Sequence, residues 1–522
     1  MKDSMKKVLC LTMAVLTCGS MVACTPDDDL RTNPNADKFL NIAYFNGGVT
    51  ADWLRELELE YEAAHPDVEV LINDELKDEL LNNNLRDNIE YMSEDIIFAH
   101  EITYSDFVRK NLLLDITDIV KAPAAAGEDT VEQRMNENLR SYYNANDKYY
   151  AVPFYTSFYG AIYNVDLFEE EALYIAKDGG YTSGLAGQPE KSYGKDGEKG
   201  TYDDGLPVTF EEYKTWLAYV KGGAIMPYIW TSNIAYRTLY LESLQIGYEG
   251  VNDYSINVTF NGTTKAGKTI TPANAYEIRG GKGAEFALSM AKEIISNGYY
   301  TREGMTGLKD QFSMRTAQDL FLDESIAMII EGGWWEKEAG GVGDRRFAYM
   351  PVPQYDDNAE AGETFCCTSG DVAVAINANT KQADLAKDFL KFTLTEHAMS
   401  TFTKNMGITR PYDYDLEDGV YDQLSYFGKN FWDLVNNPNS KIYYQTKSNE
   451  FKATETTFFG EYEWAWGSVL DIGKGSTTYT DPFKVFYDNN TISVADYIKG
   501  MNDKYNATNY TAKYNEWLAS QN

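Results

Sequence analysis

The run YYAVPFYTSFYGAIYNVDLF, residues 149–168, decides how the rest of the chain is interpreted. Its many Tyr and Phe residues favour β-structure, so the run predicts one long strand or a pair of strands. Pro153 cannot donate a hydrogen bond to a neighbouring strand and therefore marks a strand start or a crossing point. Leu167 and Phe168 precede three glutamates and indicate the beginning of a helix.

A strand, a helix and a second strand are predicted near the N-terminus, over residues 39–44, 53–64 and 68–72. This βαβ pattern predicts a parallel sheet with a ligand at the carboxyl ends of its strands. Asn46 follows the first strand at such an end and is a candidate ligand contact. A simple turn at Asn46-Gly47 is the alternative.

Further segments extend the α/β pattern. Residues 76–91 predict a helix, and residues 95–99 and 325–330 predict buried strands. Residues 254–260 are rich in β-branched and aromatic side chains and predict another strand. Trp230 lies between a strand-like segment and a helix start, a location suited to the wall of a ligand site.

Several motifs, taken in chain order, resemble the extracellular solute-binding proteins of carbohydrate importers, the maltose-binding-like family. They are VPF…GAIYNVDLF within 152–168, Ala99-His100-Glu101, Ala327-Met328 with Gly332-x-Trp334, ADLAKDFLKF at 383–392 and GITRP at 407–411. The matches cover nearly all of the chain from about residue 39. They are weaker in the middle insertion and beyond about residue 471.

The resemblance implies an α/β protein with a two-lobe, type II periplasmic-binding-protein-like fold, whose hinge the chain crosses several times. Lobe 1 would comprise residues 38–155 and 377–409. Lobe 2 would comprise residues 156–376 and 410–522. Residues 1–23 would be a signal peptide, and residues 24–37 a lipid anchor with a flexible tether.

The resemblance also implies which side chains contact a sugar. Glu101 would accept hydrogen bonds from sugar hydroxyls, since a carboxylate offers two acceptor oxygens. A solvated acid at a strand end is the alternative. Trp334 and Trp335 follow a strand end, where an indole would stack on the apolar face of a pyranose. Two tryptophans of the core are the alternative there.

Further candidate contacts are Tyr155 and Ser157 in the hinge run, and Asp371 just before the strand VAVAI. At Ser157 the sequence departs from the better-known members of the family that it resembles, which have an acid at this position. The resemblance therefore implies a different affinity or ligand length. Another stacking residue would come from FFGEYEWAW at 458–466, where the sequence does not separate Tyr462, Trp464 and Trp466.

The N-terminus has the features of an export signal, because Lys6 and Lys7 precede an apolar run over 8–15. Met21-Val22-Ala23-Cys24 resembles a bacterial lipobox, which implies cleavage before Cys24 and lipidation of that residue. An ordinary signal peptide with a chance cysteine is the alternative. No later apolar run approaches the roughly 18 residues that span a bilayer, so the lipid would hold the protein on the extracytoplasmic face of the cell membrane.

The composition excludes some functions. A formal net charge of −34 at pH 7 repels nucleic acid, so no nucleic-acid partner is expected. Beyond Cys24 only Cys366 and Cys367 remain, and two adjacent cysteines are no disulfide framework. Two buried thiols are expected, with a strained disulfide as the alternative.

Two motifs suggest chemistry that their context does not support. GTTKAGKT at 262–269 fits the P-loop pattern, but no helix is predicted to begin at its lysine, so we expect a polar hairpin loop. The Gly-rich insertion over 178–205 contains Asp196, Asp203 and Asp204, which are calcium candidates. Their spacing fits no EF-hand, and solvated turns are the favoured interpretation.

These observations predict a monomeric, non-enzymatic lipoprotein without a cofactor. It would capture an oligosaccharide, maltodextrin-like or another plant or host glycan fragment, and deliver it to the transmembrane subunits of an ABC importer. A lipid-anchored carbohydrate-active enzyme is one alternative, since a glycosidase needs two carboxylates and the chain has 80 acidic residues. A surface glycan adhesin is another.

Overall fold

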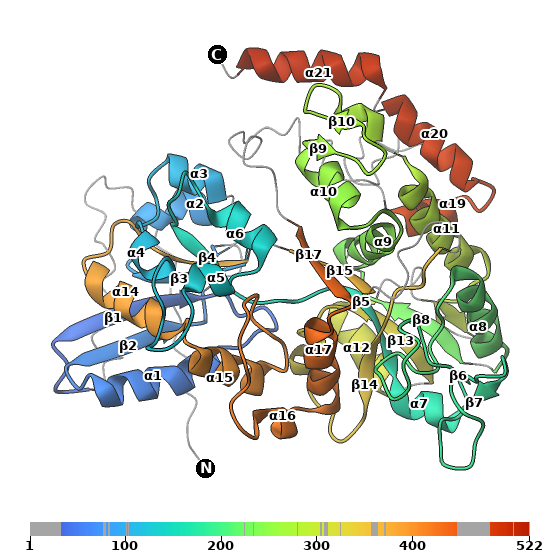
Figure 1. The fold of residues 1–522 in the computed structure, drawn as a ribbon, viewed down its shortest axis with the longest axis horizontal. Coiled ribbons are helices and arrows are strands. Elements are labelled where there is room, and N and C mark those ends of the chain that lie inside the picture. Colours follow the sequence, from blue (N-terminus) through green and yellow to red (C-terminus); the bar gives the residue numbers. More distant parts are fainter. Residues whose placement is uncertain are drawn as a thin grey trace, which may run out of the picture.

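The computed structural model describes residues 33–520 except 77–79, 82–83, 101, 103, 224, 233, 279, 303–304, 307–311, 324, 356–363, 370–371, 446–480 and 505. These residues form two α/β lobes that lie side by side, with the N-terminal lobe on the left of Figure 1. The predicted export signal, Cys24 and the aromatic run at 458–466 lie outside the described residues.

The first lobe is built on a five-stranded sheet in the order β2-β1-β3-β16-β4. β1 pairs in parallel with both β2 and β3, which confirms the predicted βαβ unit. β16 runs antiparallel to β3 and to β4. The strands are β1 Lys38–Tyr44, β2 Val68–Asn73, β3 Ile96–Ala99, β4 Ala151–Pro153 and β16 Ala373–Ile376.

Short and long helices pack around this sheet. The first helix, α1, buries Trp53, Leu57 and Tyr61 on one face, as their spacing of four residues requires. Among the described residues of the helix predicted over 76–91, helical structure begins at Leu85 in α2 and continues through η2 to Tyr91. The helices are α1 Asp52–Ala64, α2 Leu85–Asn88, η2 Ile89–Tyr91, α3 Tyr104–Arg109, α4 Thr117–Val120, α5 Val131–Arg134, α6 Glu137–Tyr143, α14 Ala383–Phe392 and α15 Glu396–Met406.

The second lobe contains a four-stranded sheet in the order β14-β5-β13-β8. β5 is antiparallel to β13 and β14, whereas β13 and β8 are parallel. β13 contributes to two cores, because Ile329 belongs to the core that extends into the first lobe, whereas Met328 and Ile330 belong to a core made of second-lobe residues. The strands are β5 Gly160–Asn164, β8 Met226–Trp230, β13 Ile326–Glu331 and β14 Phe347–Met350.

The helices of this lobe include one segment that was predicted wrongly. Residues 254–260 lie mainly in helix α10 and not in a strand, because contacts with α9 and β17 outweigh the β-preference of the side chains. The helices are α7 Val165–Glu170, α8 Phe210–Gly222, α9 Ile234–Glu249, α10 Val251–Thr259, η3 Ala275–Ile278, α11 Lys282–Ser296, α12 Met314–Asp323, α13 Trp335–Ala339, α16 Val420–Gln423 and α17 Tyr426–Asn436.

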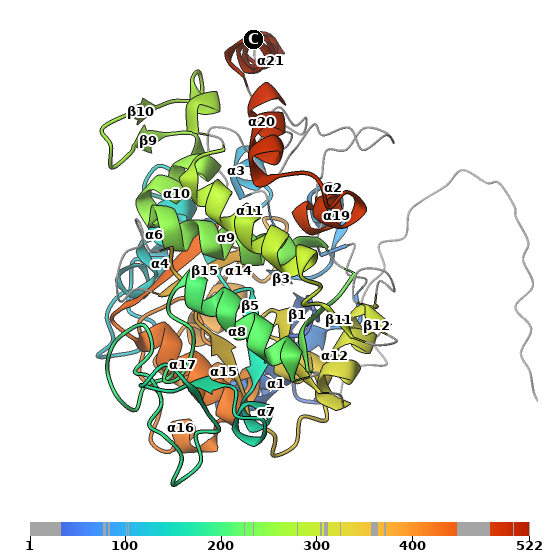
Figure 2. The same ribbon diagram turned by 90° about the vertical axis from the view of Figure 1, so that its right-hand side faces the viewer.

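Small hairpins and terminal helices complete the second lobe. The P-loop-like run forms the antiparallel pair β9 Gly262–Thr263 and β10 Thr269–Ile270, which confirms the predicted hairpin. Two further pairs are β6 Tyr174–Ile175 with β7 Tyr181–Thr182, and β11 Thr301–Arg302 with β12 Met305–Thr306. α19 Pro482–Asp488, α20 Val494–Lys504 and α21 Ala507–Ser520 follow, and the last two rise beyond the lobe in Figure 2.

The run at 149–168 crosses from one lobe to the other, since β4 belongs to the first sheet and β5 to the second. A later segment, which leads from α15 of the first lobe to the second lobe, crosses beside it in the same direction. The Thr156 N–H donates to the Thr409 carbonyl at 2.8 Å, and Arg410 Nε donates to the Phe154 carbonyl at 3.0 Å. The hinge therefore contains two crossings that are joined by hydrogen bonds.

A third crossing carries β15, Thr364–Ser369, which lies between β14 of the second sheet and β16 of the first. β15 pairs in parallel with β17, Ser440–Gln445. The predicted boundary assigned residues up to 376 to lobe 2, whereas β16 lies in the first sheet. The apolar run of β16 is buried there between β3 and β4, which places the crossing before residue 373.

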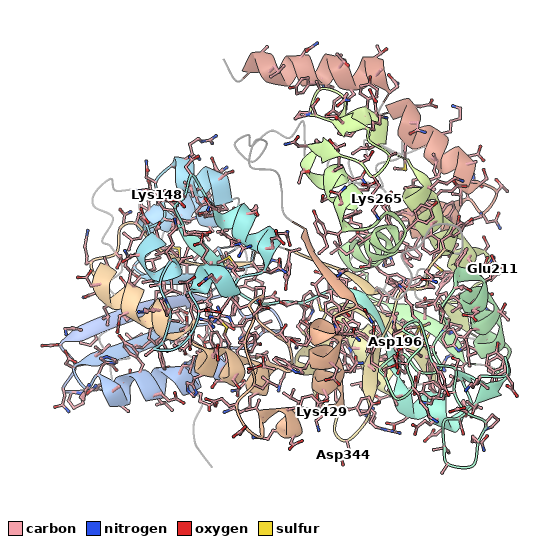
Figure 3. All side chains as sticks on the ribbon, in the orientation of Figure 1. Lys148, Asp196, Glu211, Lys265, Asp344 and Lys429 are labelled. Atoms are coloured by element: carbon pink, nitrogen blue, oxygen red, sulfur yellow. The ribbon has the colours of Figure 1, made fainter. Side chains whose placement is uncertain are left out.

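Charged side chains occupy the outside of both lobes. Figure 3 shows Lys148, Glu211 and Asp344 at the periphery of the ribbon. Within the ranges that the structure describes, no helix has the length and apolar character needed to cross a membrane.

Candidate functional site at the lobe junction

Trp334 lies where the two lobes meet. It sits in the turn after β13, and only 8% of its surface is exposed. Gly48 in the first lobe is so close that a Cβ there would lie 3.0 Å from Cδ1 of the Trp334 indole. Gly48 has a φ of +84°, in the left-handed region that favours glycine. The glycine thus allows the first-lobe loop to touch the indole.

Two tyrosines flank this indole. The Tyr159 ring centroid is 5.2 Å from that of Trp334 in an edge-on arrangement, and the Tyr236 centroid is 6.0 Å away. Tyr159 belongs to the hinge crossing, and Tyr236 to α9. Neither tyrosine was predicted from the sequence, although the place of Tyr159 within the aromatic hinge run was a usable signal. Together the rings give the junction flat apolar surfaces with polar tips.

Ser157 holds the turn that carries Trp334. Its Oγ accepts a hydrogen bond from the Gly333 N–H at 2.7 Å, and the residue is 1% exposed. A Cβ on Gly333 would lie 2.9 Å from this oxygen, so the turn has no space for a larger residue. In this structure Ser157 positions the turn and does not present an exposed hydroxyl.

A buried carboxyl lies beside the same turn. Glu331, the last residue of β13, accepts the Gly332 N–H at 3.3 Å and a hydrogen bond from Gln318 Nε2 at 3.5 Å. Burial raises the pKa of Glu331 well above its ordinary value, and the nearby Glu338 raises it further. Burial therefore shifts this carboxyl towards its protonated form.

The first lobe contributes the loop after β1 to the junction. Phe45 stacks on His100, with ring centroids 4.7 Å apart. Asn46 is exposed in the same loop as Gly48. Tyr155 is buried in the hinge crossing and packs edge-on against Phe154 at 5.1 Å. The structure thus brings Asn46 and Trp334 to one junction, with Tyr155 in the adjacent crossing.

Two of the candidate tryptophans are fully buried. Trp335 packs on Phe347, with centroids 4.8 Å apart, and Trp230 packs on Tyr300 at 5.5 Å and on Phe483 at 5.2 Å. Trp335 points away from Trp334 because successive helical residues differ by about 100° in direction. Neither Trp230 nor Trp335 presents a face to solvent in this structure.

The remaining candidates divide into two groups. Glu101, Asp371, Tyr462, Trp464 and Trp466 lie outside the described residues. In the insertion, Asp203 is 1% exposed and accepts hydrogen bonds from the Asp196 N–H at 3.0 Å and the Thr201 hydroxyl at 2.9 Å. The described part of the chain contains no group of three or more His, Cys, Asp or Glu that could hold a metal ion. The calcium interpretation of Asp196, Asp203 and Asp204 gains no support.

Two hinged α/β lobes with aromatic side chains at their junction define the architecture of a solute-binding protein. Residues 47–399 match the family described as bacterial extracellular solute-binding protein, and the chain belongs to this family. The family binds solutes and is non-enzymatic. A comparison with curated protein sequences found no match.

Solved structures confirm the predicted two-lobe fold. Apo RafE from Streptococcus pneumoniae has a TM-score of 0.56 at 14% identity, covering 92% of this chain and 100% of that chain. Thermus thermophilus maltotriose binding protein, bound with maltotriose, has a TM-score of 0.52 at 14% identity, with 90% and 99% covered. A chitin oligosaccharide binding protein has a TM-score of 0.57 at 13% identity, with 90% and 98% covered.

Proposed function

We propose that this protein binds an oligosaccharide between its lobes and presents it to the transmembrane subunits of an ABC importer. The observation that carries the proposal is the position of Trp334, which is held in the second lobe and touched by Gly48 of the first. Family membership supports a solute-binding role. Similar folds include proteins solved with raffinose and with maltotriose.

The ligand would lie between the loop after β1 and the turn after β13. Sugar rings would stack on Trp334, with Tyr159 and Tyr236 beside it, because the C–H face of a pyranose complements a flat aromatic ring. Asn46 would bind hydroxyls from the first lobe. The further hydroxyl contacts would be Glu101, Tyr155 and Asp371, and further stacking would come from Tyr462 or Trp464.

The charge of the junction favours a neutral sugar. Burial raises the pKa of Glu331 and so disfavours a negative charge there, and the aromatic side chains around Trp334 are uncharged. Lobe closure about the paired crossings would add contacts that exist only when ligand fills the gap, and this differential contact drives closure.

Attachment to the membrane would follow from Cys24. Lipidation of this residue would leave residues 25–37 as a tether between the bilayer and β1. The protein would then act as a monomer on the extracytoplasmic face. Replacement of Cys24 by Ser would release the protein from the membrane fraction, whereas retention there would contradict the lipid anchor.

The test combines binding with product analysis. The chain without its first 24 residues is titrated calorimetrically with raffinose, maltotriose and chitotriose, and each sugar is then recovered and analysed by chromatography. We expect micromolar binding of at least one sugar and its recovery unchanged. Cleavage products, or the absence of binding to all three, would overturn the proposal.

A further inference from the structure

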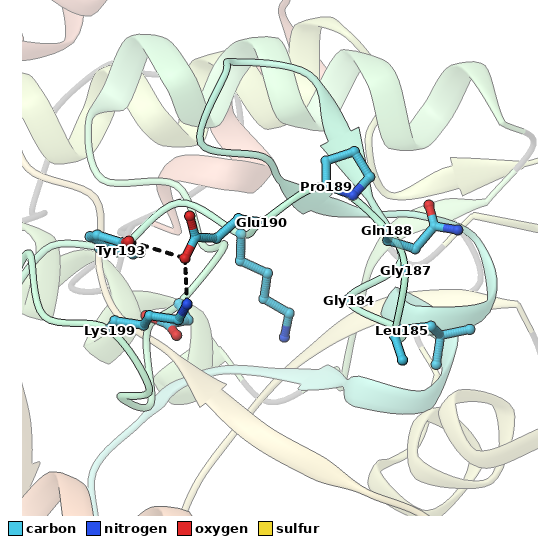
Figure 4. Close-up of a pocket in the computed structure, with 11 residues that line it drawn as sticks. Gly184, Leu185, Gly187, Gln188, Pro189, Glu190, Tyr193 and Lys199 are labelled. Carbon is cyan, nitrogen blue, oxygen red and sulfur yellow. Dashed lines mark hydrogen bonds and ion pairs between the residues drawn. The ribbon is translucent and has the colours of Figure 1, made fainter.

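The insertion between α7 and α8 forms a hollow of its own on the outer side of the second lobe, beside β6 and β7 (Figure 1). Its volume of about 470 Å³ falls within the range of about 300–1,000 Å³ typical of small-molecule sites. Figure 4 shows Tyr193, Glu190 and Lys199 on one side of it, and Leu185 and Gln188 on the other. The lining residues are 184–191, Tyr193, Lys199 and Asp204.

Lys191 is built into the wall of this pocket. Its aliphatic chain occupies space left by two glycines, since a Cβ on Gly184 would lie 2.5 Å from Lys191 Cε and one on Gly205 would lie 3.2 Å from Cδ. Both glycines have positive φ, +74° and +79°. Larger residues are therefore disfavoured there by the backbone conformation as well as by the lack of space. The Lys191 Nζ lies 3.5 Å from the centroid of the Tyr174 ring.

The Lys191 ammonium has no hydrogen-bond acceptor and no ion-pair partner within the described ranges. Burial lowers the pKa of Lys191, while the more distant Glu169 and Asp204 raise it. The ammonium thus has donor capacity that the protein itself does not use. Such a half-buried donor is costly unless a solvent molecule or a ligand accepts from it.

Asp204 supplies the complementary group. Its Oδ2 accepts the Gly200 N–H at 2.8 Å, whereas its Oδ1 is buried and receives no hydrogen bond from the described residues. The other acid of the pocket, Glu190, is already paired with Lys199 at 2.5 Å and with Lys177 at 3.2 Å. The buried Oδ1 of Asp204 is out of reach of a ligand, but Oδ2 has a second lone pair. The pocket therefore combines an unused donor on Lys191 with remaining acceptor capacity on Asp204 Oδ2.

The charges of the lining balance, because Lys191 and Lys199 oppose Glu190 and Asp204. A charged ligand would break this balance, but a hydroxyl group both accepts and donates hydrogen bonds. Leu185 and the Tyr193 ring add apolar surface for the C–H groups of such a ligand.

We propose that this pocket is a second binding site, separate from the lobe junction, for a neutral polyhydroxylated ligand of the size of a sugar residue. Lys191 donates to one hydroxyl and Asp204 accepts from another. The site does not depend on the function proposed for the junction.

The test uses saturation-transfer-difference NMR with maltotriose and raffinose at millimolar concentration. The starting protein is Trp334→Ala, which lacks the junction stacking ring. We expect saturation transfer to the sugar to persist in this variant. Adding Lys191→Met keeps the aliphatic packing but removes the ammonium, and we expect it to abolish the transfer.

A second pocket variant and a control show whether any loss of transfer is specific to the pocket. Gln188→Trp, at an exposed rim position, fills the pocket without disturbing the Lys191 packing and is expected to have the same effect. Lys148→Met, in the first lobe (Figure 3), is the control and is expected to leave the transfer unchanged. Thermal melting of each variant verifies folding.

The outcomes separate the two sites. Transfer that survives Trp334→Ala and is lost in both pocket variants supports the second site, even if the junction binds neither sugar. Loss of all transfer in Trp334→Ala alone overturns the second site and leaves the junction proposal standing. Equal transfer in every variant places the sugar elsewhere on the surface and also overturns the second site.

Discussion

Ser157 Oγ accepts the Gly333 N–H at 2.7 Å, and this bond links the hinge crossing to the turn that carries Trp334. One residue earlier, the Thr156 N–H donates to the Thr409 carbonyl of the later crossing at 2.8 Å. The aromatic surface and both crossings are thus held together by consecutive residues. A change in hinge angle is therefore expected to move Trp334 relative to the first lobe.

Replacing Ser157 by Ala should destabilise the protein and weaken ligand binding. The buried Gly333 N–H would lose its acceptor, which costs about 1–3 kcal/mol. Urea unfolding measures the loss. Ser141→Ala is the control, since that hydroxyl only donates to the Glu137 carbonyl on an exposed helix, and we expect a change within about 0.5 kcal/mol. Equal stabilities for the two variants would refute this role of Ser157.

Replacing Gly48 by Ala should weaken sugar binding more than Gly127→Ala does. Both glycines have positive φ, +84° and +96°, so both variants carry the same backbone strain of about 1–2 kcal/mol. Only at Gly48 would the new Cβ meet Trp334, because a Cβ on Gly127 would have no atom within 4 Å. Calorimetric titration compares the two affinities. Similar affinities would show that the contact with Trp334 is unimportant for binding.

The sequence predicted the regular parts of the fold well. Local patterns decide the βαβ unit at 39–72 and the hairpin at 262–269. These patterns are the alternation of apolar residues, the helical spacing and the turn residues, and tertiary contacts did not override them. The helix α10 differs, because its β-branched residues favoured a strand while packing on α9 and β17 selected a helix. The local β-preference of these residues contains no information about packing against β17, which comes much later in the chain.

The candidate site was only partly predictable. Trp334 and Trp335 are adjacent residues with the same side chain. Trp334 lies between the lobes and Trp335 lies in the core, and only the direction of each side chain from the turn distinguishes them. Tyr236 approaches Trp334 because α9 packs beside β13, and no pattern around Tyr236 signals this. Trp230 had a plausible location at a strand end, but Phe483 of α19 covers it from far along the chain.

Replacing Asp481 by Asn should be among the most destabilising single changes in the second lobe. Arg237 and Asp481 form a buried ion pair at 2.6 Å that joins α9 to the start of α19. Removing one charge leaves the other buried and unpaired, which costs about 3–5 kcal/mol. Denaturant unfolding measures this, with Asp488→Asn at an exposed pair of the same helix as control. A loss no greater than that of the control would contradict the expectation.

His397 should make stability depend on pH. Burial opposes a charge on its ring, but hydrogen bonds to Glu417 at 2.8 Å and Glu60 at 2.7 Å outweigh this, so the pKa of His397 is raised. A raised folded pKa stabilises the protein fully below the unfolded value of about 6.5, and the stabilisation is lost as pH rises through the folded pKa. His397→Gln should therefore lose more stability at about pH 5.5 than at about pH 9. A pH-independent difference would exclude this linkage.

The most direct measurement is the affinity of the Trp334→Ala variant for the sugar that the unaltered protein binds most tightly. Loss of the stacking ring should weaken binding at least about tenfold, or about 1.4 kcal/mol. Tyr91→Ala removes an aromatic ring that is 79% exposed and lies before the start of β3, and this variant should bind normally. If Trp334→Ala, correctly folded, binds the sugar as tightly as the unaltered protein, the lobe junction is not the binding site.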